Sequence, residues 1–158
     1  MRSTPRLTSR RIAAAIISLA IVSCKSATAP SGSNPAADTY AAALGVNIAQ
    51  MTKVSDALYT QDLVVGTGAV LASGDSISVT YTGWLVNGTQ FDSHVAFQTR
   101  IGVRHVIDGW DLGLVGIRVG GKRRLVIGSD LAYGAPGQGP IPPNSTIVFD
   151  VQLLARLP

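Results

Sequence analysis

The chain has 158 residues, of which 46% are hydrophobic and only 14% charged, a composition that excludes an intrinsically disordered protein and fits one domain with a short extension. Four of its 13 Lys and Arg residues lie within the first eleven positions, and the remaining basic residues balance the 9 acidic ones. The body of the chain is therefore neutral and lacks the basic surface that nucleic-acid-binding proteins use, so we expect no nucleic-acid partner.

An apolar run of eleven residues, 12–22, follows the basic start of the chain. A helix needs about 20 residues to span a bilayer, so this run is too short for one and instead fits the core of a signal peptide. Segment 21–24 (Ile-Val-Ser-Cys) resembles the bacterial lipobox, in which the signal is cleaved before a cysteine that carries lipid. Cys24 is also the only cysteine, which excludes a disulfide within the chain. We therefore predict a lipoprotein signal peptide at residues 1–23 and lipid attachment at Cys24.

Two alternatives for this segment stay open. One is an ordinary secretory signal that carries an incidental cysteine. The other concerns the export route, because residues 9–11 (Ser-Arg-Arg) hint at a twin-arginine signal, whereas the residues after them match that motif poorly. By either route we expect the protein to be extracytoplasmic and lipid-anchored to a bacterial membrane. Lys25 stands where an Asp would favour retention at the inner membrane, so we expect the periplasmic side of the outer membrane in a host with two membranes.

Residues 24–50 are expected to form a flexible tether between the lipid and a folded domain. Residues 25–35 are small and polar without a core pattern, and the Ala-rich stretch 36–50 is at most briefly helical. We therefore place the domain at residues 51–158 and expect it to fold by itself.

Alternation of apolar and polar residues predicts the strands of this domain. The pattern is clearest at 76–85, where Ile77, Val79 and Tyr81 share one face, and Asn-Gly at 87–88 signals a tight turn after it. Further strands are expected at residues 57–65, 96–103, 121–128 and 145–154.

A short helix is expected over residues 106–115, because Ile107, Trp110 and Leu114 recur at helical spacing, with Asp108 as its N-cap. Each glycine in this range weakens a helix by about 1 kcal/mol relative to alanine, so packing must hold it. One short helix on about five antiparallel strands makes an α+β fold.

Motifs for other kinds of chemistry fail. Residues 116–123 match the first seven positions of a phosphate-binding loop, but Arg123 stands where Ser or Thr must hold magnesium, and a strand follows instead of a helix. The two histidines, His94 and His105, are too few for a zinc site, and we interpret both as surface residues. The sequence therefore predicts neither a metal nor a cofactor.

Five short motifs follow one another in the second half of the chain. They lie at 79–83 (VTYTG), 87–93 (NGTQFDS), 106–110 (VIDGW), 132–134 (AYG) and 141–151 (IPPNSTIVFDV). Together they resemble the FKBP-type peptidyl-prolyl cis-trans isomerases, and the resemblance runs from about residue 58 to the C-terminus. It implies a strongly twisted antiparallel sheet of about five strands wrapped around one short helix, with an apolar pocket that receives a proline ring.

The resemblance also implies roles for single residues of that pocket. Trp110 is its floor, Asp92 and Tyr133 are polar groups at its rim, and the backbone N–H of Ile107 binds a substrate carbonyl. The hydroxyl of Tyr81 is oriented by Asp92, which makes Tyr81, Asp92 and Tyr133 the candidate catalytic residues. The walls are Tyr81, Phe91, Phe97, Val106, Ile107 and Phe149, with Ile141 on an overhanging loop.

Such a pocket implies an enzyme that accelerates rotation of X–Pro bonds in extracytoplasmic proteins and so assists their folding. It needs no metal, cofactor or nucleophile, because the planar amide carries more charge separation than the twisted transition state, and an apolar pocket penalises the planar state more. The resemblance implies proline-containing polypeptides as substrates, a monomeric enzyme, and a macrolide as a further ligand. The alternative is a catalytically weak FKBP-like module that binds peptides or acts as a chaperone.

Two loops depart from the family's pattern. Residues 93–97 are several residues shorter than in compact members and lack a basic residue that is common there. Residues 135–140 carry Gln138 where an aromatic residue or His is common. Because these loops shape the rim, they bear on macrolide affinity and substrate preference more than on activity.

Overall fold

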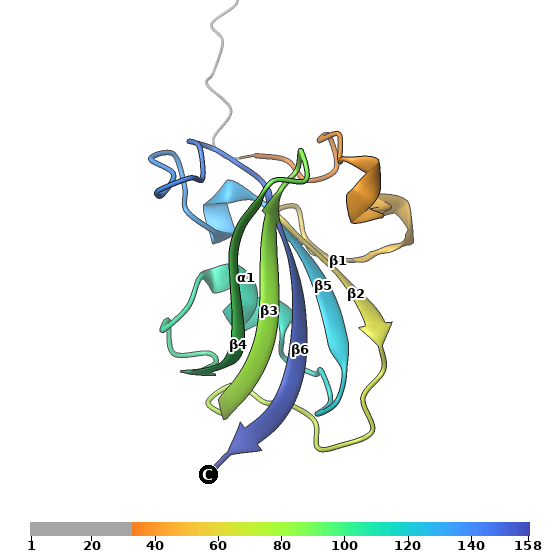
Figure 1. Ribbon diagram of the computed structural model, residues 1–158, viewed down its shortest axis with the longest axis vertical. Coiled ribbons are helices and arrows are strands. Elements are labelled where there is room, and N and C mark those ends of the chain that lie inside the picture. Colours follow the sequence, from red (N-terminus) through yellow and green to blue (C-terminus); the bar gives the residue numbers. More distant parts are fainter. Residues whose placement is uncertain (1–32) are drawn as a thin grey trace, which may run out of the picture.

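The computed structural model describes residues 33–158, and Figure 1 shows how their helices and strands are arranged. The expected signal peptide, Cys24 and the first part of the expected tether, residues 24–32, lie outside the described residues. Within the described range, no helix is long and apolar enough to cross a membrane.

A six-stranded antiparallel sheet forms the body of the domain, with the strand order β1-β2-β5-β6-β3-β4. The last strand in the chain, β6, therefore lies in the middle of the sheet between β5 and β3 (Figure 1). The expected antiparallel sheet with one short helix is confirmed, with one strand more than the approximate number expected. The strands are β1 (Thr52–Ser55), β2 (Leu58–Val64), β3 (Ser76–Leu85), β4 (Gln90–Arg100), β5 (Lys122–Ile127) and β6 (Ile147–Leu157).

The β3–β4 hairpin carries much of the later site. Strand β3 has the bounds expected from its alternation, and the turn after it places Gly88 at a φ of +88°, which glycine adopts without steric cost. Strand β4 begins at Gln90, earlier than the strand expected at 96–103. It is an edge strand whose side chains are mostly exposed, so its first half lacks the alternation that marks a half-buried strand.

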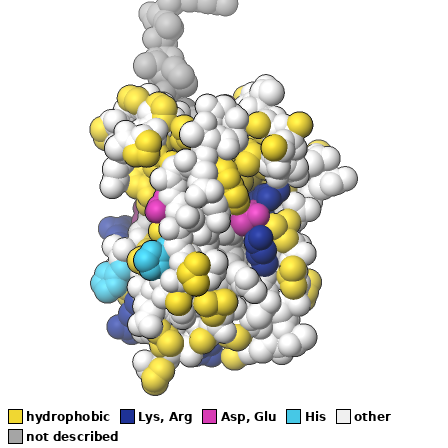
Figure 2. Space-filling view, in the orientation of Figure 1, with side chains coloured by type: hydrophobic (Ala, Val, Ile, Leu, Met, Phe, Trp, Pro, Cys, Tyr) yellow, Lys and Arg dark blue, Asp and Glu magenta, His cyan; other side chains and the backbone are white. Residues whose placement is uncertain are grey.

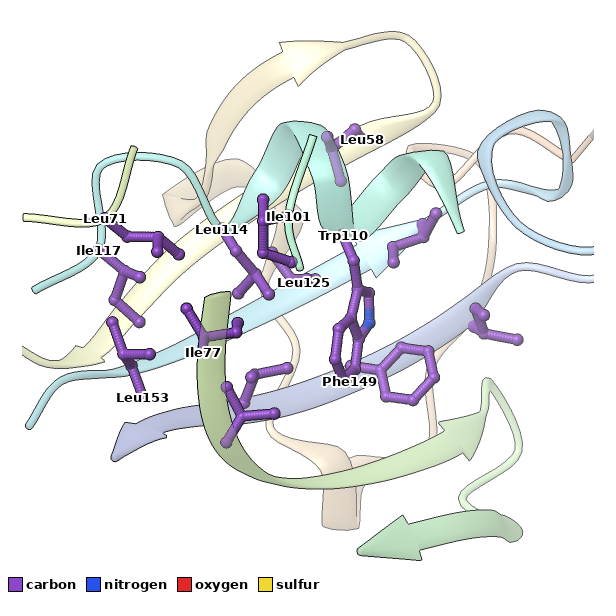
Figure 3. Close-up of a cluster of buried hydrophobic side chains, with 14 of the residues drawn as sticks. Leu58, Leu71, Ile77, Ile101, Trp110, Leu114, Ile117, Leu125, Phe149 and Leu153 are labelled. Carbon is purple, nitrogen blue, oxygen red and sulfur yellow. The ribbon is translucent and has the colours of Figure 1, made fainter. Parts of the chain in front are cut away.

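The helix α1 (Asp108–Gly113) packs against one face of the sheet over β2 and β5. Two glycines allow this close approach: a Cβ atom at Gly109 would lie 2.5 Å from Cγ2 of Ile127, and one at Gly113 would lie 2.7 Å from Cδ2 of Leu125. Trp110, between them, points toward the buried side chains of the sheet (Figure 3). The glycines that weaken the isolated helix are thus the residues that let it dock.

The N-cap of α1 is Ile107, not the expected Asp108, which is the first helical residue and is exposed. No side chain caps this helix. The acidic residue that organises the region is Asp111, whose two carboxylate oxygens accept hydrogen bonds from the backbone N–H groups of Gly102 and Arg104, both at 2.8 Å. Asp111 therefore holds the loop that enters the helix.

Residues 33–51 cover the face of the sheet that points away from α1. Leu44 is 7% exposed and packs with Tyr59, Val126 and Val148 in a second buried cluster. Two short 3-10 turns lie in this segment, η1 (Ala42–Leu44) and η2 (Ile48–Gln50). Residues 33–50, which we expected in a flexible tether, are thus part of the packed domain, because they bury an apolar sheet face that would otherwise meet water.

Hydrogen bonds fix the start of this segment. The backbone N–H of Ser33 donates to the Ser129 hydroxyl and the backbone N–H of Ser129 donates to the Ser33 hydroxyl, each at 2.8 Å. The Thr146 hydroxyl donates to the same Ser33 oxygen at 2.8 Å. Ser129 begins the turn η3 (Ser129–Leu131), and its carbonyl accepts the backbone N–H of Gly134 at 2.9 Å. The described chain therefore begins against the loop that carries Tyr133.

Candidate active site

A cavity of about 480 Å³ opens beside α1, between strands β3, β4 and β6 and the loops before α1 and after η3. Figure 3 shows Trp110 reaching from the helix to Phe149 on the sheet. Most of the site residues expected from the sequence line this cavity, namely Tyr81, Asp92, Phe97, Val106, Ile107, Trp110, Tyr133 and Phe149.

The expected wall residues Phe91 and Ile141 do not line the cavity. Phe91 lies behind Phe149, with their ring centroids 5.5 Å apart and the planes at 85°. Ile141 is 6% exposed and belongs to the main buried cluster. A Cβ atom at Gly83 would lie 2.6 Å from Cε1 of Phe149 and 2.7 Å from Cζ of Phe91, so only glycine fits beside both rings. Phe91 and Ile141 therefore support the wall from behind.

Trp110 forms the floor and is 3% exposed. Its ring contacts the edges or faces of Tyr81 at 5.1 Å, Phe149 at 5.3 Å and Phe97 at 6.5 Å between centroids, with interplanar angles of 82–86°. Edge-to-face pairs of this kind add roughly 0.5–1.5 kcal/mol beyond their buried area, so the floor is rigid as well as apolar. The indole Nε1 is buried and has no hydrogen-bond partner among residues 33–158.

One hydrogen bond joins the expected polar residues. The Tyr81 hydroxyl donates to Oδ2 of Asp92 at 2.7 Å, across the β3–β4 pair. Burial, followed by this hydrogen bond and the negative charge of Asp92, raises the pKa of the Tyr81 hydroxyl. The hydroxyl therefore stays protonated, and the position that the resemblance implies for Asp92, beside the Tyr81 hydroxyl, is present in the structure.

Tyr133 lies on the loop after η3 and is half-buried at the rim. Burial and the nearby charge of Asp92 raise the pKa of its hydroxyl. A neutral phenol donates a hydrogen bond, so the Tyr133 hydroxyl is available to an acceptor that enters the cavity.

Ile107 presents its backbone to the cavity as the N-cap of α1. Its carbonyl accepts the N–H groups of Trp110 and Asp111 at 2.9 and 3.3 Å, which fixes the peptide plane. Its own N–H makes no hydrogen bond with another described residue. The cavity thus has an apolar interior with a backbone donor and a phenol donor at its edge.

The cavity also has lining residues that sequence reasoning missed. They are Arg104, His105 and Ala132, together with Gln138, which had been noted only as a departure in a loop. His105, interpreted as a surface residue, is exposed but forms part of the lining. The signal that could have found them is position, because Arg104 and His105 directly precede the motif at 106–110.

This arrangement can enclose an apolar group of a few atoms and hold a carbonyl at its edge. The cavity lining contains no cysteine, serine or threonine to act as a nucleophile. Among the described residues, no three His, Cys, Asp or Glu side chains lie close enough together to hold a metal ion. Binding, desolvation and hydrogen bonding are the means of catalysis that an apolar cavity of this kind offers.

Comparison with known proteins gives a consistent result. Residues 68–154 match the family model described as FKBP-type peptidyl-prolyl cis-trans isomerase. Over 101 residues the chain is 52% identical to "FK506-binding protein 4" of Dictyostelium discoideum, covering 62% of this chain and 28% of that protein. Over 102 residues it is 47% identical to "FK506-binding protein" of Neisseria meningitidis serogroup B, covering 61% of this chain and 94% of that one.

Solved structures agree. A crystal structure of a peptidyl-prolyl cis-trans isomerase from Pseudomonas syringae superposes with a TM-score of 0.63 at 34% identity, covering 68% of this chain and 81% of that one. The matched region spans only about a quarter of the length of FK506-binding protein 4 from Dictyostelium discoideum and from Chaetomium thermophilum.

Proposed function

We infer the function of this chain from its family, because the chain belongs to the FKBP-type peptidyl-prolyl cis-trans isomerases. We propose that it catalyses cis–trans rotation about X–Pro bonds of polypeptides. The observation that carries this proposal is the aromatic cavity floored by Trp110, with hydrogen-bond donors confined to its edge.

The physical basis is differential binding. Rotation about an amide costs about 18–20 kcal/mol, because resonance is lost in the twisted state. The planar X–Pro bond has a more polar carbonyl than the twisted one, so transfer from water into an apolar cavity destabilises the planar ground state more. The interior formed by Trp110, Phe97 and Phe149 supplies that environment without acid–base chemistry.

The rim residues position the substrate. The backbone N–H of Ile107 and the hydroxyl of Tyr133 are two donors without a partner among residues 33–158, and each can hold a carbonyl of the peptide while the proline ring occupies the cavity. Asp92 orients Tyr81, whose ring forms part of the wall. Tyr133 and Ile107 therefore touch the substrate, whereas Asp92 acts through Tyr81.

A protease-coupled isomerisation assay on a short X–Pro peptide tests this proposal. We expect the purified protein to accelerate the slow cis-to-trans phase in proportion to its concentration. Tight peptide binding with no acceleration would instead support the alternative of a binding module or chaperone and would refute the enzymatic proposal.

We also propose that a macrolide occupies the same cavity, which is supported by the relatives named FK506-binding proteins. The short rim loop at 93–97 reduces the surface available to a large ring, which bears on its affinity. Because the macrolide and the peptide would share one cavity, we expect FK506 to inhibit the isomerisation competitively. Inhibition that does not weaken as peptide concentration rises would place the macrolide elsewhere.

We further propose that the protein is a lipoprotein that assists folding on the extracytoplasmic side of a bacterial membrane, at the outer membrane where two are present. The basic start, the short apolar run and the lipobox-like segment 21–24 support this. Both sheet faces are covered within one chain, by α1 and by residues 33–51, which supports a monomer.

Replacing Cys24 tests the anchor. We expect Cys24→Ala to abolish labelling by a fatty-acid analogue and release the protein from membranes, while Ser26→Ala, a nearby control, keeps both. Equal labelling of wild type and Cys24→Ala would refute lipidation at this residue.

A further inference from the structure

The loop before α1 holds one backbone conformation that is unusual for its residue. Arg104 has a φ of +59°, in the left-handed region that glycine adopts freely and that disfavours other residues. Among the described residues only Ala96, Arg104 and Asn144 are non-glycine residues with a positive φ. A glycine here would relieve the backbone, so arginine occupies this position at a conformational cost.

Asp111 fixes this conformation. Its carboxylate spans the turn by accepting the N–H of Gly102 on one oxygen and the N–H of Arg104 on the other. Both oxygens therefore bind the backbone, and no salt bridge joins Asp111 to the guanidinium of Arg104 within the described residues. The loop is held rigidly while the side chain of Arg104 stays unpaired.

The guanidinium of Arg104 differs from those of the other arginines in residues 33–158 because it has no hydrogen-bond partner. It makes no hydrogen bond or ion pair with any residue from 33 to 158, although its residue lines the cavity. All other arginines in that range donate at least one side-chain hydrogen bond; they are Arg100, Arg118, Arg123, Arg124 and Arg156. An unpaired guanidinium at the edge of a binding cavity is free to take a partner from outside the chain.

The surroundings favour an anionic partner. His105, next in the chain, also lines the cavity and carries no negative charge. Figure 2 shows His side chains at one edge of the molecule, with both Lys or Arg and Asp or Glu side chains near them. The one carboxylate in the lining, Asp92, already accepts the hydroxyl of Tyr81. Arg104 is therefore the one Lys or Arg side chain in the cavity lining, and on its other side it borders a hollow that Asp108 and Asp111 also line.

We propose that Arg104 is a specificity-determining residue that pairs with an acidic side chain of the substrate, so that X–Pro segments with Asp or Glu close to the proline are preferred. This inference rests on the proposed isomerase function, because it names the substrate class of the same cavity. A guanidinium and a carboxylate pair through two parallel hydrogen bonds, which gives the contact direction as well as charge.

The test uses matched peptides and the full-length protein. In a series of short peptides, a single Glu is placed at each of the three positions before the proline and each of the three positions after it. Each peptide is compared with a peptide that has Gln at the same position. The ratio of kcat/KM for the Glu and Gln peptides is measured within each protein, so differences in active fraction cancel. We expect a ratio of about two to five at one or two positions, the range for an exposed ion pair.

Variants of the protein then test whether the Glu-to-Gln ratio of kcat/KM depends on the side chain of Arg104. We expect Arg104→Gln to bring it close to one, Arg104→Lys to restore part of it, and added salt at about 0.5 M to reduce it in the wild type. Arg118→Gln is the matched control, because it removes an exposed arginine that does not line the cavity, and its ratio should equal that of the wild type. Arg104→Gly should melt no lower than the wild type while also losing the ratio.

Each result decides the proposal. Equal kcat/KM for Glu and Gln peptides at every position would overturn it, as would a ratio that survives in Arg104→Gln. If no peptide is isomerised, the proposed function fails separately, and the ratio of dissociation constants for the same peptides, followed by tryptophan fluorescence, then decides the role of Arg104 by the same criteria.

Discussion

Replacing Leu44 by alanine tests whether residues 33–51 belong to the domain in solution. Leu44 is 7% exposed, lies in a 3-10 turn of this segment, and packs on Tyr59, Val126 and Val148 of the sheet. The two valines are fully buried, and on this face of the sheet the segment is what packs over them. If the segment were a solvated tether, the side chain at residue 44 would not affect stability.

The expected loss follows from the burial of this side chain. Leu→Ala changes at buried positions cost about 2–5 kcal/mol, and the lower half applies here because a short segment without strand pairing can settle into part of the cavity. We therefore expect a loss of about 2–3 kcal/mol in the free energy of unfolding. For a domain of this size each kcal/mol lowers the melting temperature by roughly 3–5 °C, so the shift should be about 6–15 °C.

Thermal and denaturant unfolding of the full chain, followed by circular dichroism, measures this loss. Leu154→Ala is the matched control, because Leu154 lies on β6 but is 40% exposed, and it should cost well under 1 kcal/mol. Isomerase activity well below the melting temperature should be the same in Leu44→Ala and wild type, since Leu44 does not line the cavity. Equal losses for the two leucine variants would refute the packing of this segment and return residues 33–50 to a tether.

Three further predictions concern the cavity. Tyr133→Phe removes only a rim hydroxyl, so kcat/KM should fall about fivefold, as expected for a hydrogen bond of about 1 kcal/mol, with the melting temperature nearly unchanged; an unchanged kcat/KM would exclude this hydroxyl as a carbonyl donor. Trp110→Ala removes the floor and should cost about 3–5 kcal/mol of stability together with most of the activity, and full activity in the folded variant would show that proline binds elsewhere. Burial raises the pKa values of Tyr81 and Tyr133 above 10, so their contribution to stability is complete below pH 10 and is lost as the pH rises through the folded-state values. Melting curves from pH 9 to 11.5 should therefore show that the double variant Tyr81→Phe/Tyr133→Phe loses less stability above pH 10 than the wild type, and parallel losses would contradict the direction of these shifts.

Much of the fold could be predicted because turn residues and alternation agree where a strand is half-buried. Strand β3 shows this best, with its inward Ile77 and Val79 and the Asn-Gly turn after it. The first half of β4 was not predicted, because an edge strand that is exposed on both sides needs no alternation of apolar and polar residues. The run Asp92, Ser93 and His94 shows no such alternation. The packing of residues 33–50 on the sheet was not predicted for a different reason. A 3-10 turn that buries one leucine leaves no repeating pattern in the sequence.

Membership of a motif predicted most of the residues that line the cavity. It did not predict which way each side chain points. Trp110 and Phe149 both line the cavity, as expected, and their rings pack edge to face. Phe91 belongs to the same motifs but packs against the far side of Phe149, a distinction that depends on the space left by Gly83 and not on residue type. Position directly before the motif at 106–110 could have pointed to Arg104 as a lining residue, but its unpaired guanidinium and left-handed backbone are properties of the folded chain and could not be predicted from the sequence.

If Cys24 carries lipid as proposed, the hydrogen bonds of Ser33 limit how far the catalytic domain can lie from the membrane. Between Cys24 and Ser33 the chain advances nine residues, which span at most about 32 Å when fully extended. Ser33 binds Ser129, at the base of the loop that carries Tyr133, so an anchor at Cys24 would keep the substrate entrance within a few tens of ångströms of the lipid. A polypeptide held in or emerging through the same membrane shares this thin layer, and its effective concentration at the cavity far exceeds that of a protein diffusing freely through the compartment. With such a short tether, the choice of substrate would depend on how close a polypeptide lies to the membrane during its maturation as much as on its sequence.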